Sequence, residues 1–281
     1  MKNYVKKGNE IIVYNLKDFN VKQTLDCGQI FRYLINGNNA IVHSKNKQAI
    51  IRTEVDRIVI TSDEIDYFET FFDFETDYGK IKKELKNDKF LADAVDYGYG
   101  IRILKNDVFE MIVSFIISAN NNISRIKKSI EYLCLNFGEN MGGYFAFPTL
   151  KELKKATVLD YRLAGLGYRS EQLFQTINFL TETHIEQLKN STKEEQFKFL
   201  ISLKGVGEKV ANCILLFGLG VKDVFPVDTW INKVYNSLTK TNETDRKKIT
   251  KEMTLRYKNL SGYAQQYFFY YFRDKKINIT D

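Results

Sequence analysis

The sequence predicts an α+β fold, an N-terminal antiparallel β-rich domain followed by a mostly helical domain. Short runs of β-branched residues, separated by turn signals, fill the chain up to Thr61. From Tyr67 onward, apolar residues recur at helical spacing to the end of the chain. Strands that come first and helices that follow indicate segregated parts. We therefore predict a β-rich domain over residues 1–90 and a helical domain over residues 91–281, with the functional site at their junction.

Five runs have strand character, and Asn36-Gly37 between the second and the third is a strong hairpin signal. Together they predict an antiparallel meander. The predicted strands are Glu10–Tyr14, Phe31–Ile35, Ala40–Val42, Ala49–Thr53 and Arg57–Thr61.

Gly28 interrupts this β-rich part, in the segment DCGQIFR at residues 26–32. A glycine inside a strand is typical of a bulge, and it also marks a place where a ligand approaches the backbone closely. The residues alone leave both readings open.

The helical part contains a long apolar helix that ends at Ala119, followed by Asn120, Asn121 and Asn122 before a second helix starts at Ile123. Asparagines cap helices, form turns and adopt left-handed conformations. These structural uses are sufficient for one or two of the three asparagines.

Two glycine turns follow, LAGLGYR at 163–169 and LKGVG at 203–207. In the first, Tyr168 can wedge into a base stack and Arg169 can make a forked contact to a base, although an ordinary helix–helix turn explains both residues. In the second, Gly205 and Gly207 permit a sharp turn that brings backbone N–H groups close to a phosphate at a helix start.

The helix after the second turn carries Lys209, Cys213 and Phe217 at i, i+4 and i+8, so they share one stripe. A free lysine has a pKa of about 10.4. Partial burial and the positive end of a helix both favour the neutral, nucleophilic amine. Asp228, in the segment PVD, precedes the next amphipathic run. Its carboxylate can stabilise a cationic sugar or cap that helix.

The bulk composition restricts the partner and the cofactors. The 281 residues carry a net charge of +7, and 44% of them are hydrophobic, which favours a folded protein with a polyanionic partner, nucleic acid first. A lysine- and asparagine-rich composition can also reflect genome bias. No apolar run approaches the ~18 residues of a membrane span, and the N-terminus lacks a signal-peptide core, so we expect a cytoplasmic protein without membrane contact.

The three cysteines, Cys27, Cys134 and Cys213, are far apart and odd in number. This pattern favours free thiols in a reducing compartment and excludes a four-cysteine cluster. His43 and His184 have no metal-ligand spacing. We therefore expect neither a bound metal nor a cofactor.

The last predicted helix, Ser261–Arg273, is strongly aromatic, and most of its rings are expected in the core. We expect the tail after Arg273 to be loose.

Taken in order, DCGQIFR, SANNNISRI, LAGLGYR, LKGVGEKVANC, PVD and SGYAQ resemble the 8-oxoguanine DNA glycosylase/AP lyase family of the helix-hairpin-helix DNA glycosylase superfamily. The resemblance extends roughly from Gly28 to Phe269. Trp230 stands where many members have histidine, which puts a phosphate contact in doubt. Phe217 stands where methionine is common, which implies a tighter pocket wall.

The resemblance implies a role for each matching residue. Lys209 is implied as the nucleophile, Asp228 as the stabilising carboxylate, and the Gly28 carbonyl as the acceptor of the N7 hydrogen of oxidised guanine. The rest of the implied base pocket is Cys213, Phe217, Gln265 and Phe269. The implied DNA contacts are Asn120, which fills the space of the flipped base, Arg125 and Arg169 at the opposite cytosine, Tyr168 as a wedge, and Gly205 and Gly207 at a phosphate.

The implied activity is removal of 8-oxoguanine, preferably opposite cytosine, from double-stranded DNA by base flipping, lysine attack at C1′, a Schiff base and β-elimination. We expect a cytoplasmic, bacterial-type, nucleoid-associated monomer. Two alternatives remain, a glycosylase for another lesion such as an alkylated base, and a non-catalytic module that binds damaged DNA. Gly28 together with Lys209 argues against the first, and the presence of both Lys209 and Asp228 argues against the second.

Overall fold

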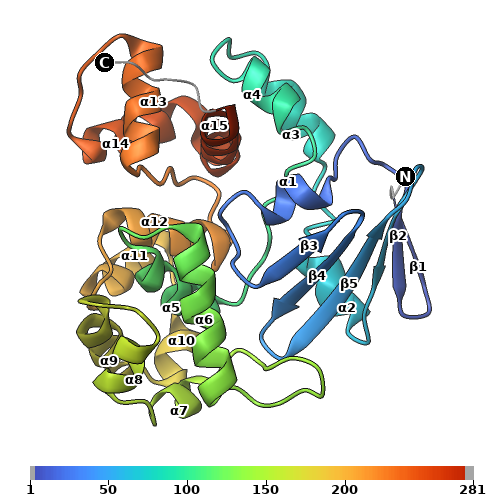
Figure 1. Cartoon of the computed structure of the whole chain (residues 1–281). Coiled ribbons are helices and arrows are strands. Elements are labelled where there is room, and N and C mark those ends of the chain that lie inside the picture. The colour runs from blue at the N-terminus through green and yellow to red at the C-terminus, as the bar shows by residue number, and fades with distance from the viewer. Residues whose placement is uncertain (1–3, 276–281) are drawn as a thin grey trace.

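The computed structural model describes residues 4–275 and confirms the α+β fold, with a β-sheet and a larger helical part side by side (Figure 1). The strands are β1 Tyr4–Lys7, β2 Glu10–Val13, β3 Tyr33–Asn36, β4 Asn39–Ser44, β5 Lys47–Thr53 and β6 Ile58–Thr61. The tail after Arg273 is predicted to be loose, but Asp274 and Lys275 continue helix α15 (Ser261–Lys275). The residues from 276 on lie outside the described part of the chain.

The helices of the N-terminal half are α1 Val21–Leu25, α2 Ile65–Phe71, α3 Tyr78–Leu85, α4 Ala92–Tyr97, α5 Val108–Ser118 and α6 Ile123–Phe137. Those of the C-terminal half are α7 Leu150–Leu153, α8 Val158–Leu163, α9 Arg169–Phe179, α10 Glu182–Asn190, α11 Lys193–Ser202, α12 Glu208–Phe217, α13 Thr229–Thr239, α14 Arg246–Tyr257 and α15 Ser261–Lys275.

The sheet is antiparallel in the order β1-β2-β6-β5-β4-β3. The predicted meander is therefore correct for β3 to β6 and wrong for β2, which pairs with β6, for instance Ile11 with Ile60. The prediction failed because α1 separates β2 from β3 in the chain, and α1 has too few residues to show a helical period. The strand predicted from Phe31 begins only at Tyr33.

Alternation buries one face of the sheet, as period 2 requires. Ile11, Val42, Ile51 and Ile60 are fully buried against aromatic residues of the α2 region such as Phe68. The helical part has its own larger core, which also takes in Cys27 and Phe31 from the N-terminal region. The predicted division at residue 90 stays a prediction.

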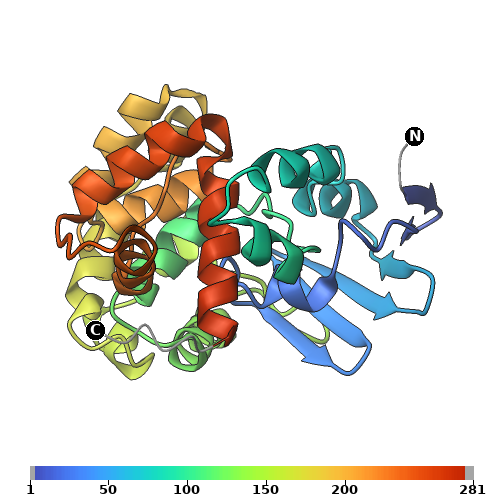
Figure 2. The same cartoon turned by 90° about the horizontal axis from the view of Figure 1, so that it is seen from above.

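Helix α5 is the centre of the helical part and packs against α6, α9 and α12. Every residue from Val108 to Ile117 is buried, which is why its sequence is apolar except for Glu110 and Ser114. Helix α15 runs between the helical part and the N-terminal part (Figure 2). Its Tyr267 and Phe268 are almost fully buried. None of the helices described here combines the length and apolar character that crossing a lipid bilayer requires.

The side chain of Arg102 links segments of the N-terminal part around Asp18, Phe72 and Tyr78. It is buried, and its guanidinium donates to the carbonyl oxygens of Phe72 at 2.8 Å and Asp18 at 2.9 Å. The same group lies 4.1 Å from the centre of the Tyr78 ring. Three chain segments are thereby joined by one side chain whose charge is spread over several acceptors.

Glu110 is a buried carboxyl group at the start of α5. Its Oε2 accepts a hydrogen bond of 2.9 Å from the Lys45 backbone N–H. Burial raises the pKa of Glu110 to about 7, and the nearby Arg32 guanidinium opposes the rise. Folding therefore favours the protonated carboxyl, and this contribution to stability is lost as the pH rises from the unfolded value of 4.5 through about 7.

We expect Glu110→Gln to become more stable than the wild type as the pH rises from 5 to 8, by up to about 3 kcal/mol. The amide keeps an acceptor for the Lys45 N–H and does not ionise. Urea unfolding at each pH measures the difference. Glu171→Gln, at an exposed position, is the matched control with a flat difference, and a flat difference for Glu110→Gln would contradict the prediction.

Lys222 is a buried cation in the segment between α12 and α13, and burial shifts its pKa in the direction opposite to that of Glu110. Its Nζ is buried, has no hydrogen-bond partner among the described residues, and lies 5.6 Å from the centre of the Tyr263 ring. Burial lowers the pKa of Lys222 to about 8, and Asp73 opposes the fall. The unfolded chain holds this proton more tightly, so stability rises with pH between about 8 and 10.5.

We expect Lys222→Met to stabilise the protein by about 1–3 kcal/mol at pH 7, because it replaces an unpaired buried charge with an apolar chain of similar length. Thermal unfolding should show the gain at pH 7 and a smaller gain at pH 9.5. Lys155→Met, at an exposed position, should change stability by less than about 0.5 kcal/mol. Destabilisation by Lys222→Met at pH 7 would refute the argument.

Candidate active site

A cavity of about 660 Å³ lies where the loop before β3, the end of α5, and the starts of α12, α13 and α14 meet α15. It leads into a smaller cavity of about 60 Å³. Five residues line both spaces, namely Gly28, Phe115, Lys209, Asp228 and Phe269. Most of the sequence-predicted site residues are therefore brought together from distant parts of the chain.

Lys209 is the second residue of α12, which begins at Glu208. The turn before it depends on Gly205, whose φ of +83° favours glycine and where a Cβ would lie only 3.1 Å from Gln172 and 3.2 Å from Ile116. Gly207 is the N-cap and has ordinary dihedrals. A side chain at Gly207 would meet no described atom, so this glycine leaves the helix start open toward the outer cavity.

Asp228 caps α13, as one of the two sequence readings predicted. Its Oδ1 accepts a hydrogen bond of 2.8 Å from the Ile231 N–H. The cap fixes the carboxylate at the cavity wall, half-buried. The Pro226 ring lies beside it in the inner cavity.

The ammonium of Lys209 lies 5.6 Å from the centre of the Phe115 ring. Burial raises the pKa of the Cys213 thiol, Lys209 opposes that rise and Asp228 adds to it. Cys213 therefore stays a neutral thiol, and both the lysine and the carboxylate lie close enough to act on it electrostatically.

The loop that carries Gly28 is not a strand bulge, because it lies between α1 and β3. Its shape is imposed from α15, where the Gln266 side chain donates to the Cys27 carbonyl at 2.6 Å. Gln29 is fully buried and donates to the carbonyl oxygen of Arg102 at 2.7 Å. Gly28 itself has a φ of +80°, and a Cβ there would lie 3.1 Å from the Phe269 ring.

The inner cavity has an unused polar group. The Oε1 of Gln265 is buried and has no hydrogen-bond partner within the described part of the chain. Such an acceptor costs free energy unless a ligand satisfies it. Phe217 forms the apolar wall, stacked on Phe115 with ring centres 5.6 Å apart and planes inclined by 14°.

The three asparagines after α5 divide between structure and surface. Asn121 donates to the Ile117 carbonyl at 3.1 Å, and Asn122 caps α6 by accepting from the Arg125 N–H at 3.0 Å. Asn120 is exposed, lines the outer cavity and has a φ of +48°. Asn121 and Asn122 thus stabilise the turn between the helices, and Asn120 and Asn121 both line the outer cavity.

Arg169 differs from the prediction. It is only 7% exposed, and its guanidinium donates to the carbonyl oxygens of Ala119 at 2.6 Å, Asn120 at 2.7 Å and Leu166 at 3.0 Å. In the structure it braces the Asn120 turn instead of projecting outward. Its contact with cytosine stays a prediction.

Tyr168 and Arg125 lie outside both cavities. Tyr168 is 59% exposed, in the turn before α9. Arg125 is exposed in the first turn of α6. Because Arg169 holds the Asn120 turn to the start of α9, Tyr168 is coupled to Asn120 through the backbone.

Several lining residues were missed from the sequence. Phe115 lies in α5, where a helix that is apolar on nearly every side has no stripe that distinguishes a pocket wall from the core. No sequence pattern indicated that Arg246 lines the cavity, because its helix is brought there only by tertiary packing. Trp230 was noted only as a departure from a family pattern, and it lines the outer cavity.

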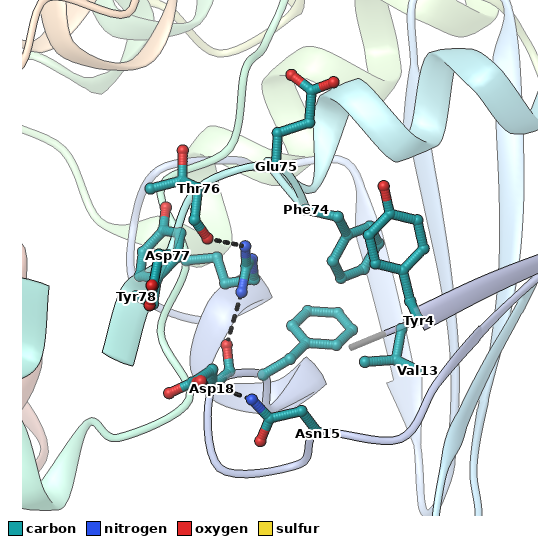
Figure 3. Close-up of a pocket in the computed structure, with 11 residues that line it drawn as sticks. Tyr4, Val13, Asn15, Asp18, Phe74, Glu75, Thr76, Asp77 and Tyr78 are labelled. Atoms are coloured by element: carbon teal, nitrogen blue, oxygen red, sulfur yellow. Dashed lines mark hydrogen bonds between the residues drawn. The ribbon is translucent and has the colours of Figure 1, made fainter. Parts of the chain in front are cut away.

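A second hollow, of about 470 Å³, lies in the N-terminal part (Figure 3). Its polar lining includes Asp18, Glu75 and Asp77. Its one cation, Arg102, is committed to backbone carbonyls. This electrostatic character does not suit a polyanion, and the hollow holds none of the predicted site residues.

The chain matches two family models in succession. Residues 11–112 match the 8-oxoguanine DNA glycosylase N-terminal domain. Residues 113–259 match the HhH-GPD superfamily base excision DNA repair protein.

Three relatives illustrate the match. The N-glycosylase/DNA lyase of Saccharomyces cerevisiae is 37% identical over 48% of this chain, which spans only 41% of the yeast protein. The probable N-glycosylase/DNA lyase of Methanothermobacter thermautotrophicus is 29% identical over 90% of this chain and 93% of its own length. The 8-oxoguanine glycosylase/lyase of Clostridium acetobutylicum, solved with double-stranded DNA containing cytosine opposite 8-oxoguanine, superposes with a TM-score of 0.91 at 38% identity over 98% of both chains.

On the sequence blocks, the two-part fold and these matches, the chain belongs to the 8-oxoguanine DNA glycosylase family within the HhH-GPD superfamily of base excision DNA repair proteins.

Proposed function

We propose that the protein is a bifunctional DNA glycosylase and AP lyase that removes 8-oxoguanine, preferably opposite cytosine, from double-stranded DNA. The observation that carries this proposal is one cavity that holds a helix-start lysine, a fixed carboxylate and a buried amide without a partner, namely Lys209, Asp228 and Gln265. A damaged base cannot be reached inside the stack, so the nucleotide must be turned out into this cavity.

The chemistry follows from the positions of Lys209 and Asp228. The neutral amine of Lys209 attacks C1′, the bond from C1′ to the base breaks with its electron pair going to the base, and the departing base takes up the proton that the attacking nitrogen releases. The carboxylate of Asp228 stabilises the positive charge that develops on the sugar. The amine adduct opens to a Schiff base, loses a proton from C2′, and expels the 3′ phosphate by β-elimination.

Recognition of the base falls to the inner cavity. The Gln265 Oε1 is an acceptor for the N–H donors on the Watson–Crick edge of a guanine, and the Gly28 carbonyl is the proposed acceptor for N7–H. Cys213 and Phe269 are the proposed flat contacts on the two faces of the base. The inner cavity measures about 60 Å³, and Phe269 is proposed to move away from Gly28 to admit a purine.

The DNA itself is handled at the rim. The open helix start at Gly207 offers N–H groups to a phosphate. Asn120 is proposed to fill the gap in the stack and Tyr168 to wedge beside it. Arg125, and Arg169 after release from its carbonyl partners, are proposed to contact the opposite cytosine.

The alternatives are weaker on the same observations. An alkylated base offers no N7–H for the Gly28 carbonyl. A module that only binds damage has no use for Lys209 and Asp228 in one cavity.

We also propose that the protein works as a monomer in the cytoplasm, on nucleoid DNA. Its three cysteines are free and buried, which fits a reducing compartment. Light scattering with and without a lesion duplex tests the stoichiometry, and a dimer in both samples would contradict it.

Borohydride trapping on a duplex with 8-oxoguanine opposite cytosine tests the nucleophile. We expect a covalent protein–DNA band with the wild type, none with Lys209→Gln, and retention of the band with Lys83→Gln, an exposed-lysine control. Asp228→Asn should slow single-turnover base release by about 100-fold or more, as loss of a charge-stabilising group does. Base release without a band in the wild type would make water the nucleophile. No release and no band would refute the proposal.

Gly28→Ala tests the base pocket separately from the chemistry. The methyl group is strained at this φ and meets the Phe269 ring, so we expect 8-oxoguanine release to fall by about 10- to 100-fold. Cleavage of a preformed abasic site, which has no base to bind, should change by less than about threefold. Equal losses in both reactions would show that Gly28 serves folding and not base recognition.

A further inference from the structure

The outer cavity has an aromatic and a cationic wall that the proposed chemistry does not use. Trp230 is 44% exposed and lines this cavity two residues after Asp228, in the first turn of α13. Arg246, the first residue of α14, lines the same cavity, and its Nη2 donates to the Thr229 hydroxyl at 3.2 Å. We call Trp230 and Arg246 the Trp–Arg rim.

The exposure of Trp230 is not explained by folding. Of the large apolar side chains that the structure describes as exposed, Trp230 is the one that lines the outer cavity. A large aromatic surface gains free energy when it is covered. The Trp–Arg rim combines this surface with a guanidinium, and nucleic-acid grooves use this pair of chemistries for bases and phosphates.

The position of the rim indicates which part of the DNA it meets. In the proposed function Asp228 stands at C1′ of the extruded nucleotide. Neighbouring nucleotides of one strand follow at a spacing of about 3.4 Å along the axis in the duplex. Asp228 is the N-cap of α13, and Trp230 lies in the first turn of the same helix. The side chain of Trp230 is therefore close enough to contact the nucleotide next to the extruded one.

We propose that the Trp–Arg rim grips the damaged strand beside the lesion, with Trp230 stacked on the adjoining nucleotide and Arg246 paired with the phosphate next to it. This rests on the proposed function and adds a positioning role to it. Stacking on a π-face tolerates any base. The rim therefore contributes affinity and alignment of C1′ with Lys209, and it does not discriminate between lesions.

Trp230 provides its own reporter, because the chain has a single tryptophan. Lys209→Gln, which cannot react, is titrated with a duplex that carries a stable abasic-site analogue, and with an undamaged duplex. Excitation selective for tryptophan should show a saturable change in emission that is larger for the analogue duplex. An unchanged emission while anisotropy of labelled DNA reports binding would overturn the stacking.

Variants then separate stacking from charge. Trp230→Ala should weaken binding of the analogue duplex by about 5- to 100-fold, whereas Trp230→Phe should recover most of the affinity. Arg246→Ala should lower the slope of log affinity against log salt by about 1, the loss of one phosphate contact. Tyr14→Ala and Arg52→Ala, exposed residues away from the cavity, are controls with unchanged binding and slope.

The reactions give a further discrimination. Under subsaturating conditions Trp230→Ala should slow base release and abasic-site cleavage by the same factor, unlike Gly28→Ala. If Trp230→Ala binds the analogue duplex with the affinity of the wild type, the proposed role of the Trp–Arg rim is wrong. A wild type that binds the analogue duplex no better than undamaged DNA, and releases no base, would instead overturn the proposed function. In that case the change of Trp230 emission on undamaged DNA would still test the stacking.

Discussion

The site depends on a hydrogen bond between the two ends of the chain, from the Gln266 side chain of α15 to the Cys27 carbonyl at 2.6 Å. A buried carbonyl must find a donor, and here the donor comes from the last helix. The bond holds Gly28 beside Phe269 on the same helix, while Gln29 fixes the other side of the loop through Arg102. The inner cavity is thus complete only when the β-rich and helical parts are packed together.

Several polar residues serve folding and the site at once. Asp228 caps α13 and in doing so is fixed at the cavity wall. Arg169 satisfies three backbone carbonyls and thereby holds the exposed Asn120 turn. This double use lowers the entropy cost of binding, because a side chain that is already held by the fold loses little further conformational freedom when DNA binds. It also means that mutation of these residues tests stability and activity together.

Lys209 lines both an inner and an outer space. The inner space, with Gln265, Gly28 and Phe269, has a buried acceptor without a partner among the described residues and an aromatic ring at its wall. The outer space holds Asn120 and the Trp–Arg rim. In the proposed function, discrimination among bases falls to the inner groups, because an unmade hydrogen bond is costly for a buried acceptor. The proposed contribution of the outer groups is affinity for any duplex, through charge and stacking.

The fold class, the helices that follow the 203–207 turn and Asp228, and the order of the site blocks could be predicted from the sequence, since caps, glycine turns and periodicity are local properties. The sequence did not determine the pairing of β2 with β6, the carbonyl contacts of Arg169, or Phe115 and Arg246 at the cavity. Each of these depends on which distant segment lies alongside. Only tertiary packing decides which face of an apolar helix lines the cavity, and which buried carbonyl oxygens accept hydrogen bonds from an arginine.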